Sequence, residues 1–357
     1  MTNVLQLSLF QTPDKKHTNF TALYDLAPRF VQRAERDNDS PYLSRVTREF
    51  PFAGDTYSVT VYPARVMDAK GEELDELPGD REALVEDVLR RFAAEKMALG
   101  EKDELMVPFS LYQIDQELRK HKHTLSYTEI KEALAILAGS KIEISRVVQP
   151  GQKKPKPVVH ASALPVLVYK DDNDPKAMSY AQFNPLLVQA IRALEFEQVN
   201  YAWMMQVRGA LPRWIFKFAS LLLADEERQT DSIHLLASDL MKGCGHSRSR
   251  ERDALTDIEK SILKLKACGV IADVRSESVK QGKVKTDIRF SIRFSDKFLN
   301  DRQEARAIRQ HRTQEAIRLT GKERPDSFHE INSDDAAKIA MKRRQLTQAP
   351  GTEPALN

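Results

Sequence analysis

The sequence predicts an α+β fold in which a unit of two helices followed by a β-hairpin occurs twice. Two stretches, beginning at Phe109 and Asp231, space their apolar residues alike, and each is followed by a strand-like run. A further helical stretch precedes each of them, over residues 81–99 and 211–226. The chain has 357 residues, which is enough for two such domains with a core.

Each unit opens with a serine that can cap a helix, Ser110 in the first and Ser232 in the second. Apolar residues then recur at i, i+3 and i+7, which puts one stripe on a helix, and a second stripe follows a polar turn. The second copy is longer between its stripes, so we expect the two units to make unequal contacts. The stripes are Leu111, Ile114, Leu118 and Ile130, Leu134, Leu137 in the first unit, and Ile233, Leu236, Leu240 and Ile258, Ile262, Leu265 in the second.

A strand begins soon after each second helix, at Ile142 and at Val270. In the second unit the return strand over residues 287–294 alternates apolar and polar residues, as a half-buried strand does. Helix, turn, helix and hairpin in this order predict two tandem winged-helix domains. We expect a flexible N-terminal arm over residues 1–40, the first winged-helix domain with extra N-terminal strands over 41–195, the second over 196–300, and a charged tail, partly helical and partly disordered, over 301–357.

The composition excludes several classes of protein. No run approaches the length of a membrane span, no signal peptide is recognisable, and the two cysteines, Cys244 and Cys268, suit a reducing cytoplasm. We expect no enzyme, metal or cofactor, because the sequence lacks a phosphate-binding glycine loop and a complete ligand set around Cys244 and His246. Residues 40–110 are acidic in balance and residues 242–299 basic, which indicates a polyanionic partner for the second unit.

The second helix of a helix-turn-helix enters the major groove of DNA, and its N-terminal residues reach the base edges. In the second unit, arginines and serines alternate at this end, before the apolar stripe begins. Arginine can bind guanine O6 and N7 with two hydrogen bonds, and lysines on the wing can bind phosphates. The residues expected to contact double-stranded DNA are Ser247, Arg248, Ser249, Arg250, Arg252 and Lys260 around the helix, and Lys280, Lys283 and Lys285 on the wing.

The first unit carries a sparser version of this pattern, so we expect it to assist DNA binding or to form a subunit interface. An alternative is that these charges are solvated faces, in which case the arginines of the second unit would pair with Glu251 and Asp253. The candidate DNA contacts of the first unit are Lys120, Lys122, His123, Thr124, Tyr127 and Lys131, with Lys153, Lys154 and Lys156 on its wing.

The N-terminal stretch QLSLF closely resembles the peptide with which bacterial replication proteins bind the sliding clamp of the replicative polymerase. The form of that motif is Gln-Leu-(Ser or Asp)-Leu-Phe, and it is matched by Gln6, Leu7, Ser8, Leu9 and Phe10. Two apolar anchors and one amide are a suitable set for a short-lived contact. The alternative is an edge strand whose leucines alternate against the fold.

The chain resembles the replication initiators of iteron-bearing bacterial plasmids in two features, the paired pattern over residues 100–300 and the pentapeptide. Within the paired pattern, the segment DALTDIEKSILKLKACGVI is the most similar to that family. The resemblance implies a cytoplasmic protein that binds origin repeats, promotes melting of an AT-rich region and recruits the clamp, the host initiator and the replicative helicase. It also implies a role in copy control and a homodimer that represses its own promoter. The strand-like block before residue 100 has no counterpart, and we expect an extra hairpin there. A winged-helix repressor without an initiation role, and an enzyme of DNA metabolism tethered to the clamp, remain alternatives.

Overall fold

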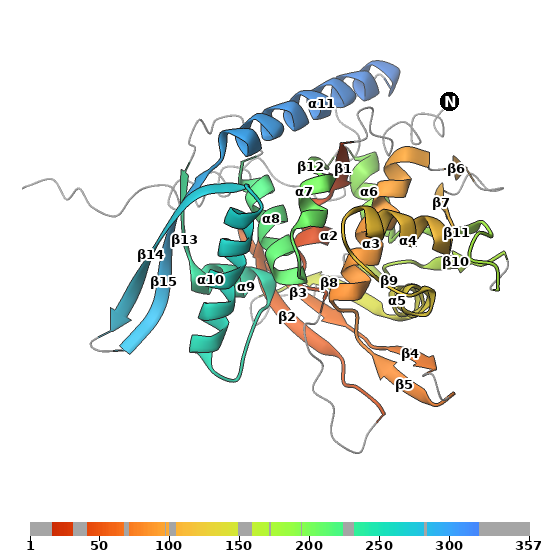
Figure 1. Cartoon of the computed structure of the whole chain (residues 1–357), viewed down its shortest axis with the longest axis horizontal. Coiled ribbons are helices and arrows are strands. Elements are labelled where there is room, and N and C mark those ends of the chain that lie inside the picture. Colours follow the sequence, from red (N-terminus) through yellow and green to blue (C-terminus); the bar gives the residue numbers. More distant parts are fainter. Residues whose placement is uncertain are drawn as a thin grey trace, which may run out of the picture.

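The computed structural model describes residues 16–30, 41–67, 71–96, 98–99, 105–148, 159–170, 173–193, 195–223, 232–281 and 284–320. Two units, each with helices followed by a β-hairpin, lie side by side and share one continuous hydrophobic core (Figure 1). The α+β architecture with tandem winged-helix units is therefore confirmed. Within these ranges no helix is both long enough and apolar enough to cross a membrane.

The first unit has the predicted order of elements. Ser110 caps its first short helix, because the Ser110 Oγ accepts a hydrogen bond from the N–H of Gln113 at 3.2 Å. Its second helix begins with a capping box between Ser126 and Glu129, and both predicted stripes are buried. The elements are α3 (Asp80–Lys96), α4 (Leu111–Lys120), α5 (Tyr127–Gly139), β8 (Lys141–Arg146) and β9 (Val159–Ser162).

The block before residue 100 adds strands to the first unit, as predicted. β2 (Val46–Phe52) and β3 (Asp55–Val61) form a hairpin, and β3 pairs with β8, which gives a sheet of order β2-β3-β8-β9. Smaller elements surround this sheet. They are the β4 (Ala64–Met67) and β5 (Glu73–Glu76) hairpin, α6 (Pro185–Arg192), and a sheet formed by β10 (Val166–Val168), β11 (Ser179–Gln182), β7 (Leu105–Phe109) and β6 (Ala98–Leu99).

The second unit is a three-stranded winged helix, and its long wing projects to the lower left in Figure 1. The strand order is β13-β15-β14, so the strand before the helices closes the sheet against the return strand of the wing. The elements are α8 (Ala210–Leu222), β13 (Ser232–Leu236), α9 (Ala237–Cys244), α10 (Glu251–Ala267), β14 (Ile271–Gln281) and β15 (Val284–Phe294).

The first stripe of the second unit does not lie on one helix as predicted: Ile233 and Leu236 belong to a strand and Leu240 to a helix. Ser232 starts β13 instead of capping a helix, and the helix begins only at Ala237. In so short a run, apolar residues fit a period of 2 as well as a helical period. Pairing with β15 decides the outcome, because Ile233 lies opposite Ile292 and Leu235 opposite Phe290 in the core.

This correction also removes the expected insertion between the helices of the second unit. With α9 as the short helix, the turns cover residues 121–126 and 245–250 and have equal length. Each turn contains a left-handed residue followed by a histidine: Lys122 (φ 61°) precedes His123, and Gly245 (φ 61°) precedes His246. The two units are therefore closer copies than their spacing in sequence suggests.

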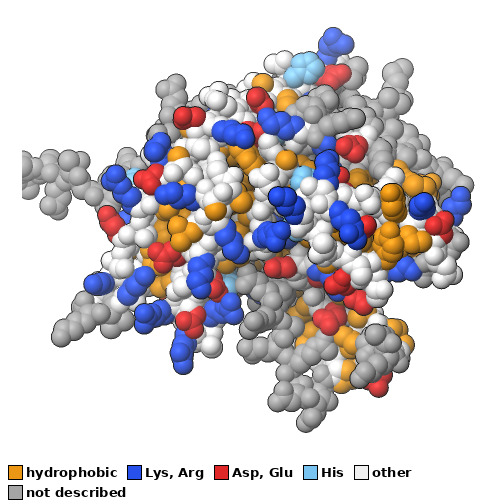
Figure 2. Space-filling model, viewed as in Figure 1, with side chains coloured by type: hydrophobic (Ala, Val, Ile, Leu, Met, Phe, Trp, Pro, Cys, Tyr) orange, Lys and Arg blue, Asp and Glu red, His pale blue; other side chains and the backbone are white. Residues whose placement is uncertain are grey.

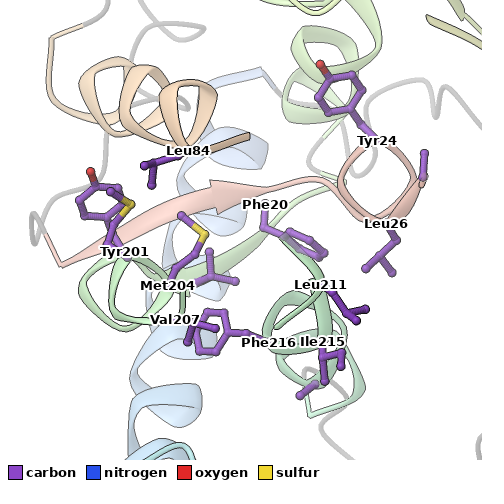
Figure 3. Close-up of a cluster of buried hydrophobic side chains, with 14 of the residues drawn as sticks. Phe20, Tyr24, Leu26, Leu84, Tyr201, Met204, Val207, Leu211, Ile215 and Phe216 are labelled. Carbon is purple, nitrogen blue, oxygen red and sulfur yellow. The ribbon is translucent and has the colours of Figure 1, made fainter. Parts of the chain in front are cut away.

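The segment over residues 16–30 belongs to the core, which contradicts a loose arm reaching to residue 40. β1 (His17–Phe20) pairs with β12 (Glu197–Asn200), and α2 (Ala22–Leu26) packs on α8. Figure 3 shows Phe20 and Leu26 beside residues of α7 (Tyr201–Gln206) and α8 in one apolar cluster. Burial of these large side chains outweighs the polar character of the neighbouring residues.

Buried charges join this segment to both units. The Asp25 carboxylate of α2 pairs with Arg90 of α3 and lies 3.4 Å from the Lys217 Nζ of α8. Lys217 also pairs with Asp87 of α3 at 2.9 Å. Burial acts to raise the pKa of Asp25, but the charges of Arg90 and Lys217 outweigh it and hold that pKa well below its ordinary value.

The charged stretch after residue 300 continues a helix, α11 (Asp296–Thr320), that crosses the top of the molecule in Figure 1. Phe298 is fully buried, and the Arg302 Nη1 donates to the Gln198 carbonyl of β12 at 2.5 Å. Asn200 Nδ2 donates to the Asp301 carboxylate at 2.7 Å. The start of the expected tail is thus docked on β12, because its charges have partners that composition does not reveal.

Candidate nucleic-acid interface

The N-terminus of α10 presents its arginines to solvent, as predicted. Arg248, Arg250 and Arg252 are exposed, whereas the first residues of the apolar stripe, Leu255 and Ile258, are buried. This separation follows from the helix period, which turns the stripe toward α8 and α9 and leaves the first turn free. The three guanidinium groups are therefore available to a ligand at this end of the helix.

Arg248 differs from the other two arginines because it has a partner. Its Nε donates to the Asp257 carboxylate at 2.8 Å, and the His246 Nε2 lies 3.1 Å from the same carboxylate. Burial acts to raise the pKa of Asp257, but the hydrogen bond and charge of Arg248 hold it below its ordinary value. The ion pair is thus made with the second turn of the helix and does not use Glu251 or Asp253.

Arg250 and Arg252 make no ion pair within the described ranges, and α10 begins without a side-chain cap. By contrast, α5 has its capping box at the corresponding place. Uncapped N–H groups and cations at a helix N-terminus favour an external anion. Ser247 and Ser249 are exposed beside them and can donate further hydrogen bonds.

The wing places two of its predicted lysines opposite each other. Lys280 and Lys285 are cross-strand partners near the tip, and both are exposed. Like charges in this position destabilise a strand pair, so a bound anion would relieve their repulsion. Figure 2 shows Lys and Arg side chains gathered over the wing and α10 at the lower left of this face.

In the first unit, several predicted contacts are already engaged. Lys120, Thr124 and Tyr127 are exposed, although Lys120 lies 3.6 Å from Glu117. Lys131 is half-buried and interacts within the protein. Lys122 is exposed. The cationic character of this turn is therefore weaker than that of the second unit.

His123 of the first unit contacts the backbone of α7, which argues against its predicted role as a DNA contact. Its Nε2 lies 2.7 Å from the Met205 carbonyl oxygen at the end of α7. Burial lowers the pKa of His123 and outweighs the opposing effect of this hydrogen bond. A neutral ring that is bound to the backbone offers little to a phosphate.

The seam between the units holds two cations that sequence analysis missed. The Arg208 Nη2 donates to the Lys122 carbonyl at 2.9 Å, and the Lys264 Nζ lies 3.4 Å from the Arg208 carbonyl oxygen. Arg208 and Lys264 are exposed, so they continue the basic surface from α10 to the turn of the first unit. Their proximity depends on how the units dock, and neither spacing nor periodicity carries that information.

Several predicted residues lie outside the described ranges. They are the clamp motif, Gln6, Leu7, Ser8, Leu9 and Phe10, and the wing lysines Lys153, Lys154, Lys156 and Lys283.

Cys244 and His246 are occupied by contacts within the protein. Burial raises the pKa of the Cys244 thiol to about 12, and the His246 ring is hydrogen-bonded to the Asp257 carboxylate. In the part of the chain that the structure describes, no group of three or more His, Cys, Asp or Glu side chains is arranged to hold a metal ion.

No protein-family model matches the sequence, and a search of curated proteins finds no match. Among solved structures, the chain is similar in fold to domains 2 and 3 of RctB, with a TM-score of 0.49 and 8% identity over 75% of this chain and 95% of that one. A second structure of RctB domains 2–3 has a TM-score of 0.43 and 8% identity, over 78% of this chain and 98% of that one. The structure of the Pi initiator protein in complex with iteron DNA has a TM-score of 0.40 and 11% identity, over 61% of this chain and 95% of that one.

Proposed function

We propose that the protein binds double-stranded DNA sequence-specifically and that α10 of the second unit enters the major groove. One observation carries the proposal: the N-terminus of α10 is uncapped and bears two arginines without partners in the described chain, next to a wing whose lysines repel each other. Bases would be bound by Arg250 and Arg252, and phosphates by Lys280 and Lys285. In this proposal Arg248 positions the turn through Asp257 and contributes less to base recognition.

The first unit assists on the same duplex. Equal turns and matching left-handed residues support a second groove-binding module, in which Thr124 and Tyr127 at the start of α5 face DNA. Its capping box satisfies N–H groups at the start of α5 and Lys120 is paired with Glu117, so we assign most of the DNA contacts to the second unit. Two modules in one chain would occupy two successive major grooves.

At the level of the cell, we propose that the protein initiates plasmid replication without catalytic activity of its own. It would bind origin repeats in the bacterial cytoplasm, promote melting of the neighbouring region, and recruit the sliding clamp through Gln6–Phe10 together with the host initiator and helicase. Repression of its own promoter by a homodimer would limit copy number. The complete match of the pentapeptide supports this proposal over a repressor, which has no need of the clamp.

DNA binding is tested with a duplex that carries direct repeats from beside the coding region and with a scrambled duplex. Arg250→Ala and Arg252→Ala should each weaken specific binding by about 1–3 kcal/mol and reduce discrimination between the duplexes. The control is Lys176→Ala, which removes an exposed cation that stacks on Tyr112 far from α10. If both arginine variants bind like the control, α10 does not contact the bases.

Clamp binding is tested by retention of the full chain on immobilised clamp. The double variant Leu9→Ala/Phe10→Ala should lose retention but keep its affinity for the repeats, because the arm and the modules act separately. Thr2→Ala/Asn3→Ala in the same arm is the matched control. Equal retention of both variants would contradict recruitment through the pentapeptide and favour the repressor.

A further inference from the structure

A cleft of about 880 Å³ separates α10 from the first unit and opens beside the turn that precedes α10. The second unit lines it with Ser261 and the lysines of α10, and the lining also includes Arg48 of β2 with Pro28 and Phe30. Gly209 and Ala210 at the start of α8 line it as well. Both winged-helix units therefore contribute to one cavity.

The charges around this cleft do not balance. Three acidic side chains line it, but Asp25 is paired with Arg90, and Asp257 with Arg248. The third, Asp80, accepts a hydrogen bond from the N–H of Ala210 at 3.1 Å. Three further cations, Arg48, Lys260 and Lys264, have no carboxylate partner among the described residues. Asp80 keeps its negative charge, so three cations face one carboxylate and the cleft has an excess of positive charge.

Arg48 is the most confined of these cations. Its Nη1 donates to the carbonyl oxygens of Pro28 and Phe30, each at 3.0 Å, so backbone dipoles orient the guanidinium without neutralising it. Burial lowers its pKa, which shows that the surroundings disfavour a charge without a counterion. An anion in the cleft would supply that counterion.

The lysines reach the cleft from α10 itself. Lys260 and Lys264 are one turn apart on the same face, and the Lys264 Nζ lies 3.4 Å from the Arg208 carbonyl oxygen at the seam. That face adjoins the exposed Ser247 and Ser249 of the turn before the helix. A ligand held there would touch the helix on its flank while the N-terminus remains free for bases.

We propose that this cleft is a phosphate-binding site shared by the two units, in which Arg48, Lys260 and Lys264 hold a phosphate group. The phosphate can come from the backbone of a duplex bound to α10 or from a free nucleotide. The first source rests on the proposed DNA-binding function, and the second does not. Lysine and arginine together suit this ligand because both charge and directed hydrogen bonds are available.

The test compares Lys260→Gln/Lys264→Gln with Lys266→Gln. Lys266 lies on the same helix and is exposed, but it pairs with Asp273 at 3.1 Å and does not line the cleft. In the first arm, affinity for the repeat duplex is measured across salt concentrations. The slope of the logarithm of the affinity against the logarithm of the salt concentration should become shallower by about 1 for each lysine that the double variant lacks. In the second arm, binding of pyrophosphate to the protein alone is measured by calorimetry.

A loss of slope with unchanged pyrophosphate binding assigns the cleft to the DNA backbone. Pyrophosphate binding that only the double variant loses assigns it to a free phosphate, even if the wild-type protein binds no DNA and the proposed function fails. If the double variant matches Lys266→Gln in both arms, the cleft binds no phosphate and the inference is overturned. Weak DNA binding by the Arg250 and Arg252 variants would leave the proposed function standing in that case.

Discussion

Lys217 ties the two units together, and its replacement by methionine should lower the free energy of unfolding markedly. Its Nζ lies 2.9 Å from Asp87 and 3.4 Å from Asp25, and all three residues are buried. Breaking a buried ion pair from one side costs about 3–5 kcal/mol, since the remaining charge stays buried. We expect about 3 kcal/mol, at the low end of that range, because Arg90 still pairs with Asp25 and Arg213 lies 3.5 Å from Asp87.

The measurement is urea unfolding of the full chain, followed by tryptophan fluorescence and far-ultraviolet circular dichroism. Lys176→Met, at an exposed lysine, should change the free energy of unfolding by no more than about 0.5 kcal/mol. A loss below about 1 kcal/mol in Lys217→Met would refute the reasoning.

Three further expectations follow from the fold. Gly245→Ala should destabilise the protein more than Gly71→Ala in thermal unfolding. Both glycines have a positive φ, which an alanine adopts at a cost of about 1–2 kcal/mol. Only at Gly245 would the new Cβ also lie 2.5 Å from Arg48 Cδ. Similar losses at the two positions would show that the turn adjusts freely. Phe20→Ala should lower the free energy of unfolding by about 3–5 kcal/mol, because this ring is 1% exposed and anchors residues 16–30 in the core. A variant as stable as the wild type would place that segment outside the core. Because the pKa of Asp25 is lower in the folded protein than the ordinary aspartate value of about 3.9, the charged carboxylate stabilises the fold above that pH, and this stability is lost as the pH falls toward the folded pKa. The free energy of unfolding should therefore fall less steeply with decreasing pH in Asp25→Asn than in the wild type. Parallel pH profiles would exclude that contribution.

Hydrophobic period and capping residues allowed most of the first unit to be predicted. Ser110, the stripe of α4 and the stripe of α5 are where the pattern placed them. The hydrophobic period gave the wrong element over residues 232–236, because a run of this length is compatible with both a helix and a strand. Sequence analysis also missed the docking of residues 16–30 and of α11, since both depend on contacts with residues that are distant in the sequence.

The candidate site was predictable only where it is local. The exposure of Arg250 and Arg252 follows from their position before the stripe of α10. The engagement of His123 with Met205, and the proximity of Arg208 to Lys122, arise from the packing of one unit on the other. Long-range packing of this kind leaves no mark on the spacing of residues along the chain.

Hydroxyl-radical footprinting on a duplex with direct repeats tests most directly whether the chain carries two groove-binding modules. Two protected clusters should appear on one face of the duplex, about 10–10.5 base pairs apart, and the cluster under α10 should weaken in the Arg250→Ala/Arg252→Ala variant. Protection confined to one groove, or equal protection of repeat and scrambled duplexes, would contradict tandem recognition.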